Sequence, residues 1–441
     1  MRKLSSGDSG VAMTNLSLLE RRTRLLGKGA PLFYNSPLHI VQGDGVWVYD
    51  ANGKKYLDAY NNVPVVGHCH PRVVEAISHQ VHVLNVHTRY LHENVLDYAE
   101  RLTSTFDASL DMAVFTCTGS EANDLALRMA RRLTNGMGII CSNATYHGNT
   151  AAVDELSTLF TGGISASRNV SAVPFPDYYR TAPGLTDEAL LDAYVAKVAD
   201  AIAAFQTSGI GFAGMLVCPI FANEGLPAAP PEYLKRVANL VREAGGLLIF
   251  DEVQAGFGRT GRMWGQDTVG VIPDIATMGK PMGNGHPIGG LVARAEIVNR
   301  FRDEVMYFNT FGGNPVSCAA GLAVLQTIEE EGLVANSREV GQYLFDGMRS
   351  LQQDHALVGD VRGSGLFFGV EIVSNRDDKT QDPEATNQLL NMMKDRGVLI
   401  GRIGPFNNVL KIRPPLPFSK ANADQLLNAL DESLGTLRSI Q

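Results

Sequence analysis

The 441-residue sequence lacks the features that mark several large classes of protein. No stretch approaches the ~18 apolar residues that a membrane-spanning helix needs. The N-terminal MRKLSSGDSG has no apolar core behind its basic residues, so we expect neither a membrane protein nor a signal peptide. Basic residues are not in excess, because 38 Lys and Arg stand against 46 Asp and Glu (formal net charge −8), which argues against nucleic acid as a main partner.

Cysteine is also scarce, and the five cysteines are scattered without a CxxC pair. An odd number of isolated thiols is typical of a reducing compartment and of free, mostly buried cysteines, so we expect a cytoplasmic protein. Glycine, in contrast, is abundant: the 45 glycines exceed the usual share of ~7%. This abundance suits an α/β enzyme in which the backbone must approach a cofactor.

The order of apolar runs predicts an α/β fold. After about residue 94, short apolar strands alternate with amphipathic helices, which is typical of βαβ units and a mostly parallel sheet. The last third mixes helices with strands that we expect to be antiparallel, and Asn52-Gly53 predicts a hairpin near the N-terminus. We therefore expect an N-terminal arm and hairpin at 1–60 that joins the small domain, a large domain at 61–317 and a small α+β domain at 318–441.

A possible anion site follows the first strand of this alternating region. Ligands of a parallel sheet bind beyond the carboxyl ends of its strands. There, Gly119 and Ser120 open a helix whose free N–H groups and dipole favour an anion. The segment lacks both the GxxxxGK of a nucleotide P-loop and the GxGxxG of a dinucleotide fold. A plain N-capping serine would explain it equally well.

Three further strand ends carry groups of chemical interest. Asp251 ends a buried strand and needs a positive partner there. Lys280 follows another strand among glycines, and Tyr146-His147 follows a third. Taken singly, Asp251 also suits a structural ion pair, Lys280 a solvated surface position, and Tyr146-His147 simple packing. Taken together, an anion site, an acid, an aromatic face and a lysine fit one ligand, pyridoxal phosphate (PLP).

The same segments resemble a known family. The runs FTCTGSEANDLALRMARR, YHG, DEVQAGFGRTG, TMGK and FNTFGGNP, with VRGSGLFFGVE and KIRPPL in the last third, are similar to class III (ω-type) aminotransferases. The resemblance runs from about residue 30 to 437 with the motifs in the family's order. It implies PLP fold type I, with a large domain around a mostly parallel central sheet and a smaller α+β domain. It also implies a homodimer with two active sites at the subunit interface.

The resemblance assigns roles to the residues that would act on the cofactor ring. Lys280 would bond covalently to the aldehyde, and Asp251 would pair with the pyridinium nitrogen. Val253 and Tyr146 would sandwich the ring, and Gln254 would lie near the phenolic oxygen. Lys280, Asp251 and Tyr146 are the predicted catalytic residues.

The remaining predicted contacts involve the cofactor phosphate and the substrate. Gly119 and Ser120, with Thr310 of the neighbouring subunit, would bind the phosphate, and His147 is a further predicted cofactor contact. Arg413 would meet a substrate carboxylate or another anion.

The chain departs from the family at one point. The family usually has Glu-Pro at the end of the strand before DEVQ, whereas this chain has Cys218-Pro219. A carboxylate that would support the site from behind is therefore not expected from this position.

Two reactions are compatible with such a site. NNVPVVGHCHP, GKPMGNGHP and the Pro281 that follows the lysine resemble the subgroup of phospho-lyases that act on ethanolamine phosphate or 5-phosphohydroxylysine. Elimination of phosphate and ammonia, with ethanolamine phosphate as the leading substrate, is therefore the first hypothesis. An ω-transaminase that uses pyruvate or another oxo acid is the second. A catalytically dead scaffold is the third, and the presence of all the cofactor motifs argues against it.

A phospho-lyase needs a second anion site for its substrate. The candidates are Arg413, Arg89 and Lys411, with Asn62 and His68 as possible neighbours. For Arg89, a surface or interface salt bridge is an equal alternative. Arg413 would serve an amino acid's α-carboxylate as well as a phosphate, so it does not separate the two reactions.

The histidine-rich stretch does not predict a metal site. His68-Cys69-His70 has the wrong spacing for ligands from one strand face. The later histidines do not gather on one side of a helix, so we expect core or interface positions. They are His79, His82, His87 and His92.

Overall fold

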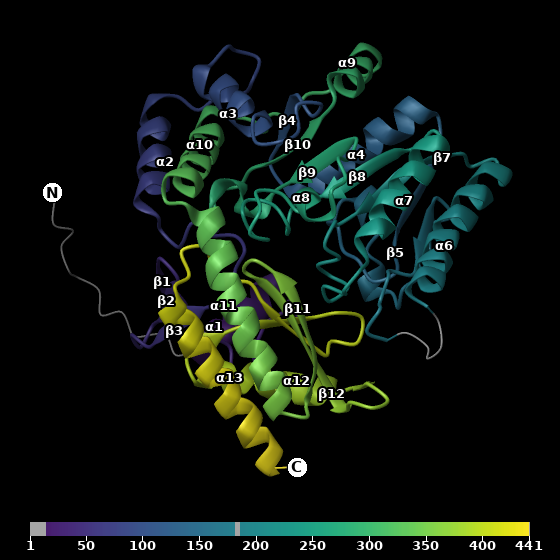
Figure 1. Ribbon diagram of the computed structural model, residues 1–441. Coiled ribbons are helices and arrows are strands. Elements are labelled where there is room, and N and C mark those ends of the chain that lie inside the picture. The colour runs from purple at the N-terminus through teal and green to yellow at the C-terminus, as the bar shows by residue number, and fades with distance from the viewer. Residues whose placement is uncertain (1–14, 181–185, 441) are drawn as a thin grey trace.

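Short, fully buried apolar runs form a seven-stranded sheet in the centre of the large α/β region (Figure 1). The computed structural model describes residues 15–180 and 186–440. The strand order is β4-β10-β9-β8-β7-β5-β6. The strands are β4 (Met112–Thr116), β5 (Gly138–Ser142), β6 (Val170–Val173), β7 (Phe212–Val217), β8 (Leu247–Asp251), β9 (Ile275–Met278) and β10 (Gly289–Ala293).

The sheet is mostly parallel, as its unbroken apolar runs predict. The ladders β5–β6, β5–β7, β7–β8 and β8–β9 are all parallel. β10 is antiparallel to both of its neighbours, β4 and β9. Because the parallel strands share one direction, the loops after β5, β7, β8 and β9 emerge at one edge of the sheet.

Helices cover both faces of this sheet. Apolar side chains of α4 and α9 pack on one face, and those of α6 and α7 pack on the other, in two separate core clusters. Burial on both faces explains why the strands carry almost no polar residues until they end. The helices of this region are α2 (Pro71–Val83), α3 (Glu93–Thr103), α4 (Gly119–Thr134), α5 (Ala151–Asp154), α6 (Asp187–Thr207), α7 (Pro231–Glu243), α8 (Gln266–Val269) and α9 (Ala295–Glu304), with the 3₁₀ turns η1 (Thr158–Phe160) and η2 (Lys280–Gly283).

Strands from the N-terminal and C-terminal parts of the chain pair in a second region. The predicted hairpin at Asn52-Gly53 is confirmed, because β2 and β3 pair antiparallel around it. β3 also pairs parallel with β14 from the C-terminal part, which gives the sheet order β1-β2-β3-β14. These elements are α1 (Asn15–Leu26), β1 (Ile40–Asp44), β2 (Trp47–Asp50), β3 (Lys55–Asp58) and β14 (Val398–Leu399).

The C-terminal third is an α+β arrangement with antiparallel strands, as predicted. Its sheet has the order β11-β12-β16-β15, and β13 pairs with β12. Long helices α11 and α13 lie side by side along it (Figure 1). The elements are α10 (Pro315–Glu330), α11 (Leu333–Asp354), α12 (Pro383–Asp395), α13 (Lys420–Ile440), β11 (Val358–Ser364), β12 (Phe367–Asn375), β13 (Thr380–Gln381), β15 (Gly401–Ile403) and β16 (Val409–Ile412).

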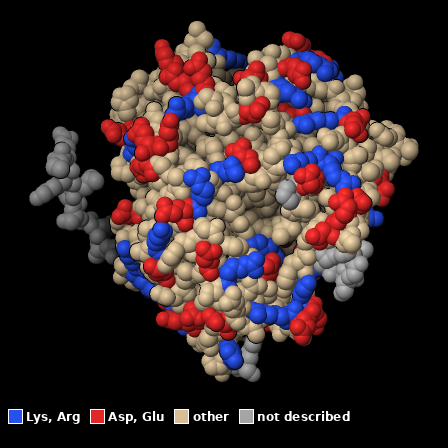
Figure 2. Space-filling model, viewed as in Figure 1, with Lys and Arg blue, Asp and Glu red and all other residues tan. Residues whose placement is uncertain are grey.

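The division into domains at residues 60 and 317 stays a prediction, and residues 1–14 of the predicted arm lie outside the described part of the chain. No helix among the described residues is both long and apolar enough to cross a membrane. The same residues contain no group of three or more His, Cys, Asp or Glu side chains arranged to hold a metal ion. On the face shown in Figure 2, basic and acidic side chains are interspersed rather than gathered into a basic area.

Candidate active site

The loops that follow β4, β5, β7, β8 and β9 surround one cavity of about 90 Å³. The sequence predicts functional residues after four of these strands, and the structure brings those residues to a single place. The residues that line the cavity are Gly119, Ser120, Tyr146, His147, Gly148, Cys218, Asn223, Asp251, Val253, Gln254 and Lys280.

Asp251 is the last residue of β8, and its carboxylate lies buried at the floor of this cavity. Oδ2 lies 2.7 Å from Nδ1 of His147 and accepts a hydrogen bond from Nδ2 of Asn123 at 3.1 Å. Oδ1 accepts from the backbone N–H of Val253 at 2.9 Å. These contacts fix the carboxylate in one orientation.

The same contacts keep Asp251 ionised. Burial is the largest influence and would by itself raise the pKa of this carboxyl. The hydrogen bond and charge of His147, the charge of Lys280 and the Val253 N–H outweigh burial, so the pKa lies below its usual value. The cavity floor therefore carries a fixed negative charge that suits a protonated ring nitrogen.

Lys280 begins the 3₁₀ turn η2 directly after β9, and it lines the same cavity as Asp251. Its backbone adopts a positive φ of 27°, which aims the side chain away from the direction that the strand would give it. The side chain is in contact with solvent through the cavity, but protein atoms surround it on the other sides. The surrounding protein lowers the pKa of the amine by desolvation, and Arg413 lowers it further, while Asp251 acts in the opposite direction. A lowered pKa favours the free amine, which is the nucleophilic form.

Gly119 and Gly279 bring two backbone segments into close contact beside Lys280. A Cβ on Gly279 would lie 2.9 Å from both Cα and N of Gly119, and a Cβ on Gly119 would lie 2.9 Å from Cγ2 of Val253. A side chain at Gly279 would displace the backbone of Gly119, and a side chain at Gly119 would displace the side chain of Val253. The glycines therefore set how closely the start of α4 approaches the loop of the lysine.

The N-terminus of α4 is capped in a way that leaves room for an anion. Thr118 Oγ1 accepts from the N–H of Glu121 at 3.1 Å, and Glu121 Oε2 accepts from the N–H of Cys117 at 2.7 Å. This reciprocal cap satisfies two of the free N–H groups at the helix start. The backbone N–H groups of Gly119 and Ser120 remain at the cavity wall, where the helix dipole favours negative charge.

Tyr146 and Val253 enter the cavity from different loops. The Tyr146 ring packs edge-on against Phe160, with 5.6 Å between the ring centroids. Its backbone carbonyl accepts a hydrogen bond from Nδ2 of Asn223 at 2.8 Å. Val253 is buried, and its carbonyl accepts from Nδ2 of Asn62 at 3.3 Å. Both positions suit a flat ring between an aromatic and a branched aliphatic side chain.

Two buried basic side chains meet at the carbonyl oxygen of Gln254. Nζ of Lys411 donates to Oε1 of Gln254 at 2.8 Å, and Nη1 of Arg413 donates to the same oxygen. The amide nitrogen of Gln254 donates to Oδ1 of Asn223 at 2.8 Å. Lys411 and Arg413 form no salt bridge with a described carboxylate, so their positive charge is not neutralised by direct contact.

Burial makes this concentration of charge costly. It lowers the pKa of Lys411 well below its ordinary value, with further lowering by Arg413 and Lys280. Burial likewise lowers the pKa of Arg413 to about 10. An anion beside these two side chains would restore the balance of charge. The structure thus offers a second anion-binding group in addition to the start of α4.

Cys218 directly follows the strand β7 and lines the cavity at the position where the resemblance would place glutamate. Burial raises the pKa of its thiol, which is therefore neutral. A carboxyl group nevertheless lies behind the site, because Glu224 is buried six residues further on and contacts Ser142 Oγ. Burial raises the pKa of Glu224 as well, so this carboxyl favours its neutral form.

Six of the predicted residues lie outside the cavity wall: Lys411 and Arg413 stand behind Gln254, and the other four are Asn62, His68, Arg89 and Thr310. Nε of Arg259 donates to Oδ1 of Asn62 at 2.9 Å, so Asn62 supports Val253 from behind rather than facing the cavity. Nε2 of His68 lies 2.7 Å from Oδ2 of Asp58. Arg89 and Thr310 are exposed and do not reach the cavity of their own chain.

Two asparagines that the sequence analysis did not single out connect the site. Asn123 joins Asp251 to Oγ1 of Thr277, and Asn223 joins Gln254 to the backbone of Tyr146. Both left a signal in the sequence. Asn123 is one helical turn after Gly119, on the buried face of α4, and Asn223 follows an apolar strand.

These features fit PLP. The ionised Asp251, the amine of Lys280, the helix start at Gly119 and the aromatic face of Tyr146 line one cavity. The close approach of Gly119 and Gly279 shapes its wall.

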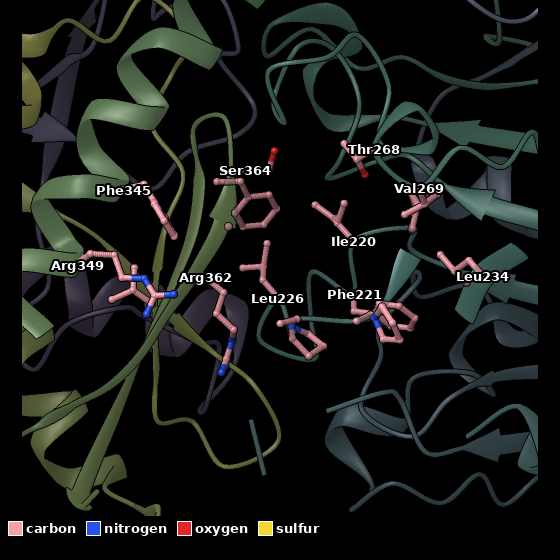
Figure 3. A pocket seen from close by; sticks show the side chains of 18 residues that line it. Ile220, Phe221, Leu226, Leu234, Thr268, Val269, Phe345, Arg349, Arg362 and Ser364 are labelled. Atoms are coloured by element: carbon pink, nitrogen blue, oxygen red, sulfur yellow. The ribbon is translucent and has the colours of Figure 1, made fainter. Parts of the chain in front are cut away.

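A larger hollow of about 370 Å³ lies between the α/β region and the C-terminal region (Figure 3). Its lining is mostly apolar, with Ile220, Leu226 and Phe345 among the labelled side chains. Its more buried arginine, Arg362, is already paired with Glu371. The hollow has no lysine or carboxylate in its lining, so it does not offer the chemistry of the smaller cavity.

Comparison with known proteins agrees with this geometry. The model of the family "Aminotransferase class-III" matches residues 32–434. A phospholyase from Arthrobacter, solved in complex with phosphoethanolamine, is 47% identical with a TM-score of 0.91 over 95% of this chain and 99% of that one. Ethanolamine-phosphate phospho-lyase homolog 1 of Caenorhabditis elegans is 38% identical over 434 residues, covering 95% of this chain and 93% of the relative.

A third relative has the name of a transaminase. Alanine–glyoxylate aminotransferase 2-like of Drosophila melanogaster is 40% identical over 437 residues, covering 96% of this chain and 88% of the relative. The fold, the cavity and these matches lead to one conclusion: the chain belongs to the class III aminotransferase family of PLP-dependent enzymes, with PLP fold type I.

Proposed function

We propose that this enzyme is a phospho-lyase that eliminates phosphate and ammonia from a phosphorylated amine, with ethanolamine phosphate as the leading substrate. The observation that carries the proposal is the pair of buried basic side chains, Lys411 and Arg413, on the oxygen of Gln254, where a bound anion would favour the protonated form of Lys411. They provide an anion site beside the cofactor cavity, which a phosphorylated substrate requires. The similarity to a phospholyase solved with phosphoethanolamine supports the same substrate class.

The cofactor supplies an electron sink: bound PLP withdraws electrons from the substrate carbon next to nitrogen and so acidifies its C–H bond. Asp251 keeps the ring nitrogen protonated, because its own pKa is held low. Val253 and Tyr146 hold the ring between them. Gly119, Ser120 and His147 complete the proposed contacts to the cofactor in this chain, and Thr310 of a second subunit adds another.

Lys280 is the proposed general base. When substrate is bound, its Nζ takes the proton from the acidified carbon, for which a lowered pKa suits it. The electron pair of that C–H bond then expels phosphate from the neighbouring carbon. Lys411 and Arg413 hold the phosphate and stabilise the charge that develops as its C–O bond breaks. Water completes the balance: one ethanolamine phosphate and one water give acetaldehyde, ammonia and phosphate.

The active enzyme is proposed to be a homodimer. Thr310 and Arg89 lie on the surface, in neighbouring segments joined by contact of Arg89 with the Phe308 ring at 3.9 Å. The same segments expose large apolar side chains, including Leu91 at 97% and Met306 at 83% exposure. Exposed apolar groups of this size typically mark a protein interface. A second subunit packed here would bring Thr310 and Arg89 toward its partner's cavity.

The five free thiols favour a reducing compartment, for which we propose the cytoplasm.

An ω-transaminase is the alternative, favoured by the name of the Drosophila relative. In that case Arg413 would hold the α-carboxylate of an amino acid or oxo acid. The two reactions differ in stoichiometry, because elimination needs no amino acceptor whereas transamination stops after one half-reaction without one.

One experiment separates the two reactions. Purified enzyme loaded with PLP is mixed with ethanolamine phosphate and no oxo acid, and free phosphate is measured. Many turnovers per active site are expected. No phosphate release, together with pyruvate-dependent transfer of an amino group from an amine, would overturn the proposal and establish the transaminase.

A further inference from the structure

A second hollow, unrelated to the cofactor cavity, has the composition of an anion site. It has a volume of about 340 Å³ and shares no lining residue with that cavity. Two arginines, Arg262 and Arg338, line it, and its lining contains no aspartate or glutamate. The hollow is thus open space bordered by positive charge alone.

One face of α11 forms one wall of the hollow. Arg338, Gly341, Gln342 and Phe345 follow the i, i+3, i+4, i+7 spacing of a single helical face. Phe345 also borders the hollow of Figure 3, so it stands between the two spaces. The helix therefore presents one guanidinium, one amide and one aromatic ring to the same space.

The opposite walls come from two loops. The loop after Arg259 contributes Thr260, Gly261 and Arg262, and the end of β11 with the turn that follows it contributes Gly363 to Gly365. The loops are joined because Ser364 Oγ donates to the carbonyl of Thr260 at 2.8 Å. Glycine is frequent in these walls, so a ligand would approach the backbone closely.

The two arginines have free hydrogen-bonding capacity. Within the described parts of the chain, neither forms an ion pair or a side-chain hydrogen bond. The acid next to Arg338 in sequence, Glu339, is engaged by Lys420 at 2.7 Å. Burial raises the pKa of Asp267, and the nearby charge of Arg262 opposes this rise, but the Asp267 carboxylate accepts from the backbone of Trp264 rather than from the arginine. A guanidinium offers five donors in a fork that matches phosphate oxygens.

An unsatisfied hydroxyl lies in the same wall. Thr260 is 4% exposed, and its Oγ1 is buried without a hydrogen-bond partner. Buried polar atoms are almost always paired, and an unpaired one calls for an explanation such as a ligand. Thr260 is therefore an unpaired polar group in the wall that Arg262 and Arg338 also line.

We propose that this hollow binds a phosphorylated small molecule, with its phosphate held between Arg262 and Arg338. The proposal is independent of the reaction at the cofactor cavity. The hollow borders the active-site segment, because Thr260 and Arg262 continue the chain that carries Asp251, Val253 and Gln254.

Inorganic pyrophosphate is the probe that tests this proposal. The PLP-loaded enzyme is titrated by calorimetry, and hydrogen exchange of backbone amides is followed with and without pyrophosphate. We expect saturable binding, with protection in residues 259–263 and 338–345. The double variant Arg262→Ala/Arg338→Ala should bind this probe at least tenfold more weakly and lose that protection.

The matched control is Arg300→Ala/Arg302→Ala, which removes two exposed arginines of α9. It should bind as the unaltered enzyme does. Neither pair of arginines lies in the cofactor cavity, so both variants should release phosphate from substrate at the normal rate. Equal pyrophosphate binding by both double variants, or protection confined to residues 118–121 and 411–413, would overturn the proposal.

Discussion

Nδ1 of His147 lies 2.7 Å from Oδ2 of Asp251, and both side chains are buried. The histidine therefore stabilises the ionised carboxylate. In His147→Leu this support is lost, burial dominates and the pKa of Asp251 rises. The carboxylate then takes up its proton at a higher pH, so the acidic limb of the kcat/KM profile should move to higher pH.

The profile is measured as phosphate release from ethanolamine phosphate. Asp251→Asn serves as the reference, because it carries no titrating carboxyl at this position and should lose roughly 10²–10³-fold in kcat. An acidic limb that does not move in His147→Leu would show that this histidine does not control the ionisation of Asp251.

Lys411 should bind the phosphate of the substrate. Lys411→Met removes one charge-assisted hydrogen bond of ~1.5–3 kcal/mol, so kcat/KM for ethanolamine phosphate should fall roughly 10–100-fold. Lys411→Arg keeps the charge and should retain much of the activity. Because burial lowers the pKa of Lys411, the amine loses its proton as pH rises, and KM of the unaltered enzyme should rise with it. A Met variant with unchanged kcat/KM would contradict this role.

The neutral thiol of Cys218 should matter for the choice of substrate. Cys218 lies near Lys280, Lys411 and Arg413, because a thiolate at this position would raise the pKa of each of these side chains. In Cys218→Glu a carboxylate would pair with Lys411 and Arg413 and repel a substrate phosphate, so phosphate release should fall at least ~10-fold. Cys218→Gln has similar bulk without the charge and should lose less. An equal loss in both variants would mean that bulk, not charge, is responsible.

A shared active site predicts complementation between subunits. Lys280→Ala should be inactive, and Thr310→Asp should weaken binding of the cofactor phosphate through charge repulsion. In a mixed dimer, one cavity has both lesions and the other has neither. Random pairing after co-refolding should restore about a quarter of the sites. No gain above the separate variants would place Thr310 outside the partner's cavity.

The contact between Gly119 and Gly279 should affect stability. In Gly279→Ala the new methyl group would meet the backbone of Gly119 at 2.9 Å, which we expect to cost ~1–3 kcal/mol. The thermal midpoint should fall, and PLP absorbance should decrease with it. Gly435→Ala is the control, because a Cβ there meets nothing within 4 Å. Equal midpoints for the two variants would contradict the prediction.

The sequence predicts the sheet and the cavity well because both follow from local patterns. Buried strands appear as apolar runs, and Gly119, Asp251 and Lys280 appear as interruptions where those runs end. Parallel pairing then brings the interruptions to one edge of the sheet. The strand β1, which pairs with the predicted hairpin, was not predicted. Its residues are mostly exposed, so they form only a weak apolar pattern in the sequence.

Contacts between distant segments could not be predicted in this way. Asn62 is a polar residue in a loop near the cavity, but its direction depends on Arg259, nearly two hundred residues away. Arg89 and Thr310 lie outside the cavity of their own chain, and their proposed roles depend on a second subunit. The meeting of Lys411 and Arg413 on Gln254 depends on how β16 docks against the loop after β8.

Arg259 gives the fold one consequence for protein engineering. Its guanidinium donates to Asn62 and to the backbone carbonyls of Leu366 and Pro414, so three distant stretches of chain converge on a single buried side chain. A fragment cut out at residues 61–317 would leave this arginine buried without two of its acceptors. The fragment 61–317 should therefore not fold on its own. It should reach its native form only when the C-terminal third is present, either in the same chain or as a co-expressed fragment.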